Sequence, residues 1–243
     1  MKRILIVGGA NGMGLSIAKV LTARAETEKV YIVDKSPLAN EYQDDKIESI
    51  QFDLTNENYS VFNQFTDIDG LIITAGFGKL ALFENIDEQM IPLYFSVNAV
   101  AVIRIIKHFY DRLLSKEDFY CAVMGSIAGF MSSPFFSIYG ATKAALKIFI
   151  ESVNVELEKA GTSNRILNVS PGSIKGTSFN QGKTELKLIF PLAKEIIEHL
   201  ERKDDLFIPQ YEEVFKSVLK RYHEDFRKEG LHSYEYKMDS GRL

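Results

Sequence analysis

Tyr139 and Lys143 are the first candidates for chemistry, because they lie four residues apart in a segment with helical periodicity. Side chains at this spacing share one face of a helix. A phenol titrates near pH ~10, and a nearby cation favours its anion. We therefore expect Lys143 to lower the pKa of Tyr139 and make it a usable acid or base. The same spacing occurs twice more in the chain, but only Tyr139 has a serine, Ser126, 13 residues upstream and just past an apolar run.

A glycine cluster forms a second candidate site, where an apolar run meets a helical pattern. Glycine permits a tight turn and lets the backbone approach a pyrophosphate closely. The N-terminus of the helix that follows offers free N–H groups and a partial positive charge. The cluster therefore predicts a dinucleotide-binding turn, formed by Gly8, Asn11, Gly12, Met13 and Gly14.

An acidic residue, Asp34, follows the last of these glycines after 20 positions, at the end of the second apolar run. Its carboxylate can accept hydrogen bonds from ribose hydroxyls and would repel a 2′-phosphate, which favours NAD over NADP. The adjacent Lys35 could instead meet that phosphate, so both cofactors remain open. The ends of the third and fourth apolar runs complete the predicted cofactor edge: Asp53, Leu54, Ala75 and Gly76.

These candidates lie at the ends of short apolar runs that alternate with helical patterns over the first 170 residues. Continuous apolar runs are typical of strands buried on both faces, and the alternation indicates a parallel sheet with right-handed crossovers. We expect strands near 4–7, 30–33, 47–52, 71–75, 119–124 and 166–169. Helices are expected near 15–22, 91–114 and 138–160, the last of them ending at Gly161.

Composition excludes several classes of protein. The 243 residues are 46% hydrophobic and 26% charged with a net charge of −4, which excludes a disordered chain and does not favour nucleic acid or anionic membranes. One cysteine, Cys121, cannot form an internal disulfide or a cysteine-rich zinc site, and the four histidines lack metal spacing, so we expect no metal. We find no linker, signal peptide or apolar stretch near ~20 residues, and expect one cytoplasmic domain over 1–243.

The C-terminal part of the chain is densely charged, with 10 acidic and 8 basic residues from Pro191 to Gly230. Apolar residues recur at helical spacing from Val214 to Phe226, so we expect a long helix with one face packed on the body. The run from Leu206 to Pro209 predicts a short edge strand that the proline ends.

Taken in order, these motifs resemble those of the short-chain dehydrogenase/reductases of the shorter type. The resemblance covers about residues 1–178 and rests on Gly8-xxx-Gly12-x-Gly14, Asp34, Asp53-Leu54, Ala75-Gly76, Asn98, Ser126, Tyr139-xxx-Lys143 and Pro171-Gly172. It implies an α/β fold, a Rossmann-type doubly wound parallel sheet in the order 3-2-1-4-5-6 with helices on both faces. A short seventh strand and an extra charged C-terminal helix would be added to it.

The same resemblance implies an oxidoreductase that moves a hydride between NAD or NADP and a small carbonyl or secondary alcohol. Tyr139 would be the general acid or base, and Ser126 would bind the substrate oxygen. Lys143 would hold the nicotinamide ribose, and Asn98 a water of the proton relay. The segment beside the nicotinamide contributes Pro171, Gly172, Ile174 and Thr177, although the family's usual threonine position holds Gly176 here.

The substrate end is expected to be apolar, within a substrate loop and helical extension at 179–230. No arginine stands in the stretches that flank the catalytic segment to clamp a carboxylate, and the aromatic pocket candidates are Phe130, Phe136 and Phe179. We expect a small substrate with apolar character, no nucleic-acid partner, and a homodimer or homotetramer.

Two other functions remain open from the sequence. A dinucleotide-binding redox sensor or scaffold without turnover would account for the amphipathic tail, although such a protein does not need an acid/base. A peripheral membrane enzyme acting on lipid-like carbonyls rests only on the apolar pocket and the tail helix.

Overall fold

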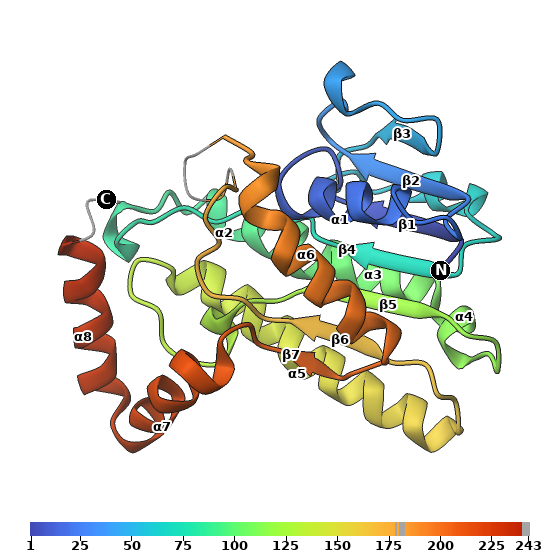
Figure 1. The fold of residues 1–243 in the computed structure, drawn as a ribbon. Helices are drawn as coiled ribbons and strands as arrows, with labels where there is room; N and C mark the ends of the chain where they lie inside the picture. Colours follow the sequence, from blue (N-terminus) through green and yellow to red (C-terminus); the bar gives the residue numbers. More distant parts are fainter. Residues whose placement is uncertain (178, 180–182, 240–243) are drawn as a thin grey trace.

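One parallel sheet organises the chain, in a computed structural model that describes residues 1–177, 179 and 183–239. Within these residues seven strands lie in the order β3-β2-β1-β4-β5-β6-β7, with helices on both faces (Figure 1). The strands are β1 (Arg3–Val7), β2 (Lys29–Asp34), β3 (Ile47–Gln51), β4 (Gly70–Ile73), β5 (Tyr120–Met124), β6 (Ile166–Val169) and β7 (Leu206–Phe207). The predicted doubly wound order is confirmed, with the short seventh strand at the edge beside β6.

Helices cover both faces of the sheet, and the last two helices of the chain lie at one end of the molecule (Figure 1). The helices are α1 (Gly12–Thr22), α2 (Met90–Phe95), α3 (Ala101–His108), α4 (Tyr110–Leu114), α5 (Ser137–Ala160), α6 (Leu186–Glu201), α7 (Lys216–Glu224) and α8 (Phe226–Asp239). On β1, Ile4 and Ile6 pack with α1 and α6, whereas Leu5 and Val7 pack with α3, α4 and α5. Both faces of the strand are thus buried, as its continuous apolar run predicts.

The segment Met90–His108 is continuously helical and long and apolar enough to cross a membrane, with a mean hydropathy of 1.5. This differs from the expectation that no apolar stretch reaches that length. The reason is that α2, a π-helical turn at Ser96–Val100 and α3 follow one another without a break. In the fold, Ala101, Val102 and Ile105 of this segment belong to the core on one face of the sheet. The apolar character of the segment is therefore that of a helix packed in a protein core.

The C-terminal part differs from the single long helix that its periodicity predicts. A π-helical turn (Tyr211–Phe215) leads into α7, and the chain turns at Asp225, whose backbone is extended, before α8 begins. Figure 1 shows α7 and α8 as a hairpin at one end of the molecule. The predicted apolar face is only partly covered, since Val214 and Phe226 remain exposed. Periodicity predicts helical conformation but does not locate a break at a residue that adopts extended backbone.

Candidate active site

Ser126 and Tyr139 come together because the turn after β5 packs directly on the first turns of α5. Ser126 begins a short 3₁₀ turn, Ile127–Gly129, and its hydroxyl oxygen accepts a hydrogen bond from the Ala128 N–H at 3.1 Å. A Cβ at Gly129 would lie 2.7 Å from the Lys143 carbonyl oxygen, so only glycine fits between this turn and the helix. The close approach places the serine hydroxyl in a side-chain hydrogen bond with the Tyr139 phenol.

Tyr139 and Lys143 lie on one face of α5, as predicted, with the Lys143 ammonium 5.6 Å from the centre of the phenol ring. Both side chains are buried. Burial raises the pKa of Tyr139 to about 12, against a smaller lowering by the hydrogen bond with Ser126. Burial also lowers the pKa of Lys143 to about 8. The expectation of a lowered Tyr139 pKa is therefore wrong, because desolvation of the phenol outweighs the hydrogen bond with Ser126.

The Lys143 ammonium is held at the carboxyl edge of the sheet. It donates to the Met124 carbonyl at the end of β5, at 2.7 Å. A Cβ at Gly76 would lie 3.5 Å from this ammonium and 3.3 Å from the Asn98 Oδ1. The ends of β4 and β5 thus bring Gly76, Asn98 and Lys143 into one neighbourhood.

Asn98 lies in the π-helical turn between α2 and α3 and is fully buried. Its Oδ1 accepts from the Phe77 N–H at 3.0 Å, and its Nδ2 donates to the Phe77 carbonyl at 2.8 Å. The amide therefore clamps the backbone that follows Gly76. A π-helical turn widens a helix locally and is frequent at functional sites.

The glycine turn between β1 and α1 is closed by backbone contacts. A Cβ at Gly14 would lie 2.5 Å from the Thr74 Oγ1 and closer still to the Gly8 carbonyl oxygen, which itself accepts from the Thr74 hydroxyl at 2.8 Å. Gly14 is thus required by space. The N-terminus of α1 receives no cap bond from the side chain of Asn11, its N-cap residue, and has no acidic residue in its first turn. Its N–H groups and partial positive charge suit a phosphate.

Asp34 ends β2 beside this turn, as expected. One carboxylate oxygen accepts from the Ala10 N–H at 3.0 Å and the other from the Ser36 N–H at 2.9 Å. Asp53 follows β3, and its carboxylate accepts from the Thr55 N–H and hydroxyl, both at 2.8 Å. These two hydrogen bonds lower the pKa of Asp53, and the charge of Lys35 adds a smaller lowering. Leu54 is buried behind them.

The predicted nicotinamide segment runs from Ser126 toward the glycine turn. The Pro171 carbonyl accepts from the Ile127 N–H at 3.0 Å, which places Pro171 beside the residue that follows Ser126. Ile174 packs on the core beneath, and Thr177 reaches the glycine turn, where a Cβ on Gly12 would lie 3.9 Å from the Thr177 Cβ. The segment thus spans the distance between the two predicted halves of the site.

Sequence reasoning missed Thr184, whose hydroxyl accepts a hydrogen bond from the Gly12 N–H at 3.1 Å. Thr184 lies near the glycine turn because the N–H of the next residue, Glu185, donates to the Gly176 carbonyl at 2.9 Å. Thr184 and Gly12 are 172 positions apart, and no periodic pattern connects them. The beginning of the predicted substrate loop, at residues 180–182, lies outside the described residues.

Comparison with known proteins identifies the family of the chain. Residues 2–187 match the family model of the short chain dehydrogenases. The chain belongs to this family. An uncharacterized oxidoreductase of Saccharomyces cerevisiae is 26% identical over 200 residues, which are 77% of this chain and 64% of that relative's length.

Solved short-chain dehydrogenase structures share the fold. A short chain dehydrogenase/reductase from Burkholderia phymatum, in complex with NAD, superposes with a TM-score of 0.79 at 16% identity, over 93% of this chain and 94% of that one. One from Sphingobium yanoikuyae, in complex with NADPH, has a TM-score of 0.73 at 21% identity, over 93% and 96% of the two chains. These likenesses establish the architecture of the dehydrogenase sheet and the helices around it.

Aromatic rings surround the phenol of this dehydrogenase. The Phe136 and Phe179 rings lie 5.3 Å and 5.2 Å from the Tyr139 ring, and 6.0 Å from each other. Phe77 and Tyr94, which the sequence did not single out, stack at 4.5 Å and pack against the same cluster. The third pocket candidate, Phe130, instead packs under the Lys147 ammonium at 5.1 Å. The wall around Tyr139 is apolar, which accounts for the raised pKa of its phenol.

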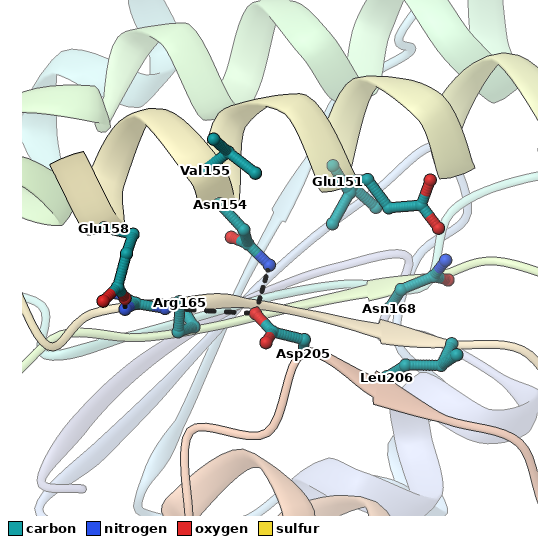
Figure 2. A pocket seen from close by; sticks show the side chains of 9 residues that line it. Glu151, Asn154, Val155, Glu158, Arg165, Asn168, Asp205 and Leu206 are labelled. Atoms are coloured by element: carbon teal, nitrogen blue, oxygen red, sulfur yellow. Dashed lines mark hydrogen bonds and ion pairs between the residues drawn. The ribbon is translucent and has the colours of Figure 1, made fainter.

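A hollow of about 470 Å³ between α5 and the β6–β7 edge lies away from this chemistry (Figure 2). Its lining includes Asn154, which follows Tyr139 by 15 residues and is thus roughly 22 Å along the helix. Asn154 donates to the Ile166 carbonyl and to Asp205, and accepts from the Ile166 N–H. Arg165 forms ion pairs with Glu158 and Asp205. These groups tie the helix to the sheet edge.

Within the described residues, no three His, Cys, Asp or Glu side chains gather as a metal site would need.

Proposed function

We propose that the protein is an NAD(P)-dependent oxidoreductase that transfers a hydride between nicotinamide and a small carbonyl or secondary alcohol of apolar character. One observation carries the proposal. A buried phenol, Tyr139, is hydrogen-bonded to Ser126 and lies 5.6 Å from the buried ammonium of Lys143, at the carboxyl edge of a doubly wound sheet. Ligands of such sheets bind at this edge.

The residues present fit a dinucleotide. The N-terminus of α1, where the Gly12 N–H donates to the Thr184 hydroxyl, offers the N–H groups of its first turn and a partial positive charge to a pyrophosphate, with Thr177 beside it. Asp34 has spare lone pairs for ribose hydroxyls, since each of its oxygens accepts one N–H bond. When bound, the nicotinamide would supply or accept the hydride. The Asp34 charge favours NAD, and Lys35 keeps NADP possible.

The chain's own residues handle the proton. With a pKa of about 12, the Tyr139 phenol keeps its proton at neutral pH and can donate it to a substrate oxygen. Ser126 is placed to donate a hydrogen bond to the same oxygen and stabilise its developing charge. Lys143 remains cationic below its pKa of about 8 and favours the phenolate as the proton leaves. The arrangement suits carbonyl reduction.

The test replaces Tyr139 by phenylalanine, which keeps the ring and removes the acid. The parent and Tyr139→Phe are assayed with NAD(H) and NADP(H) against a panel of ketones and secondary alcohols. Turnover should fall by about 10³-fold, within the range that general acid–base catalysis contributes. The dissociation constant of the cofactor should stay within about twofold, because Tyr139 reaches the substrate oxygen rather than the pyrophosphate turn.

Tyr110→Phe is the matched control, because its hydroxyl lies on α4 beside Glu156. This variant should turn over like the parent. Undiminished turnover in Tyr139→Phe would sink the assignment. Tight cofactor binding by the parent with no turnover on any carbonyl or alcohol would favour the redox sensor or scaffold.

Assembly and location stay predictions. We propose a homodimer or homotetramer, supported by Ile148 and Val155, which lie exposed seven residues apart on one face of α5. Sedimentation at several concentrations would measure the state. A cytoplasmic location rests on composition and the single buried cysteine.

A further inference from the structure

We propose that helix α8 is a positioning element of the active site, in which Tyr234 and Lys237 hold the strained loop at 132–136 and thereby keep Phe136 against Tyr139. The inference rests on the proposed function and names residues of the tail that act through this loop. The starting observation is a strained backbone conformation in this loop, which needs support from the surrounding structure.

Phe135 has a backbone φ of 67°, in the left-handed region that a bulky side chain rarely adopts. Such strain persists only where the surroundings over-determine it, and it gathers at functional sites. Phe135 is 5% exposed, and its carbonyl accepts from the Ala81 N–H at 3.0 Å. The strained residue stands four positions before Tyr139. The packing around it therefore has to be strong.

Helix α8 supplies much of that packing. The Tyr234 ring lies on the Phe135 ring with centroids 4.6 Å apart and planes at 32°. The Lys237 ammonium donates to the Ser133 hydroxyl and to the Pro134 carbonyl, both at 2.8 Å. Residues three apart share a helix face, so one face of α8 holds three consecutive residues of the loop.

The helix is itself anchored to the body. Arg221 on α7 donates to both carboxylate oxygens of Glu229 on α8, at 2.7 and 3.0 Å, and Glu229 is only 9% exposed. This bidentate pair fixes the angle of the hairpin. At its other end, the Phe215 ring fills the space beside Gly172, where a Cβ would lie 2.7 Å from the ring. The tail thus contacts both the predicted nicotinamide segment and the loop before Tyr139.

Phe136 transmits the constraint to the phenol. It follows Phe135 directly, and its carbonyl accepts from the Gly140 N–H at 2.7 Å in the first turn of α5. Its ring lies 5.3 Å from the Tyr139 ring, and the Lys237 ammonium lies 5.6 Å from the Phe136 ring. If the torsion at Phe135 relaxed, the Phe136 ring would leave the wall of the substrate pocket.

The first test needs no substrate. The chain contains no tryptophan, so Phe136→Trp introduces a single tryptophan at the wall of the pocket, which can be excited selectively over the 11 tyrosines. In that background, Tyr234→Ala and Lys237→Met should shift the emission to the red and raise acrylamide quenching about twofold, because a released loop is locally open to solvent. Tyr234→Phe keeps the ring and should match the reporter parent.

The matched controls lie on the same helix. Leu231 is 64% exposed and Lys228 is exposed, so Leu231→Ala and Lys228→Met should leave emission and quenching unchanged. Far-UV circular dichroism checks folding, and if Tyr234→Ala unfolds as a whole, Lys237→Met decides. Unchanged quenching in Lys237→Met, together with unchanged quenching in a folded Tyr234→Ala, would overturn the inference.

The second test uses the carbonyl that the substrate screen identifies, with Phe136 in place. Tyr234→Ala and Lys237→Met should raise the KM for the carbonyl about fivefold while kcat and cofactor affinity change less, because the wall is displaced and the acid remains. A fall in kcat with an unchanged KM would also overturn it. If no carbonyl is turned over, the proposed function fails, and the reporter measurement still decides the role of α8.

Discussion

Around Gly8 and Gly14 the backbone of β1, α1 and the end of β4 closes on itself, whereas around Tyr139 side chains from several segments meet. In the first region the contacts are backbone approaches and N–H bonds, so the sheet fixes them as it forms. In the second, Phe136 and Phe179 pack against the phenol, and the loop beneath is held by α8. The glycine turn is therefore intolerant of added volume, and the region around Tyr139 is sensitive to charge and burial.

The largest effect is expected where the backbone is closest. A methyl group at position 14 would meet the Gly8 carbonyl and the Thr74 hydroxyl, and the carbonyl cannot move without shifting the backbone of the turn. Gly14→Ala should lower the free energy of unfolding in urea by about 3 kcal/mol or more, as overpacking against backbone does. Cofactor affinity should fall with it.

Gly230→Ala gives the matched comparison in the tail. A Cβ there would make an ordinary contact, at 3.4 Å from the Ser132 Oγ, within a helix. Alanine in a helix is favoured over glycine by up to about 1 kcal/mol, so this variant should be as stable as the parent or more so. Equal losses from the two alanines would contradict the contrast between a rigid turn and an adaptable tail.

The second prediction concerns the buried cation. Burial lowers the pKa of Lys143 from 10.5 in the unfolded chain to about 8 in the folded one. Below pH 8 the folded chain therefore contains a buried charge, which lowers its free energy of unfolding. Between the two values the unfolded state binds more protons, and stability rises with pH. Lys143→Met should therefore need more urea to unfold than the parent at pH 7. Its free energy of unfolding should be higher by about 2 kcal/mol, after the lost hydrogen bond to the Met124 carbonyl is subtracted. Turnover should fall in the same variant.

The pH profile is the sharper readout for Lys143→Met. Its advantage should shrink as pH rises through 8 and be gone near 10.5, where the unfolded lysine is neutral too. Tyr139, with a folded pKa of about 12, makes both proteins less stable above pH 10, and this loss cancels in the difference. Lys147→Met is the control, because Lys147 pairs with Glu151 at the surface, where such pairs contribute about 1 kcal/mol at most. An advantage that persists above pH 10.5 would show that the gain comes from packing.

The two regions also differ in how far the sequence predicts them. Gly8, Gly14 and Asp34 are recognisable because a tight turn and a strand end each restrict a residue locally, and Tyr139 and Lys143 because helical spacing is local too. The alternating apolar runs predict a parallel sheet, the family resemblance implies its strand order, and both are confirmed. The end of α5 at Gly161 is confirmed in the same way.

Contacts between distant segments could not be predicted. Lys237 donates a hydrogen bond to the Ser133 hydroxyl, 104 positions earlier in the chain, and no pattern of apolar or charged residues connects the two. The direction of the Tyr139 pKa shift was missed for the same reason. It depends on rings such as Phe179 that pack on the phenol, and a single sequence does not report which side chains exclude water from a site.

The smallest effect is expected at Asp34, whose carboxylate is already held by two backbone N–H groups. Asp34→Asn keeps the shape and one acceptor, but removes the charge and leaves the Ala10 or the Ser36 N–H without its partner. Stability should fall by about 1 kcal/mol. The preference for NAD over NADP, measured by cofactor titration, should fall about tenfold, equal to about 1.4 kcal/mol.

Asp53→Asn separates the two carboxylates at this edge of the sheet. Asp53 accepts from the Thr55 N–H and hydroxyl in its own turn, so its charge is already engaged there and the cofactor preference should stay within about twofold of the parent. If Asp53→Asn shifts the preference for NAD over NADP and Asp34→Asn does not, then the carboxylate that selects the cofactor is Asp53, after β3, and not Asp34, at the end of β2. The backbone turn at Gly14 would then bind the cofactor without choosing it, and selection would lie one strand further from the catalytic side chains.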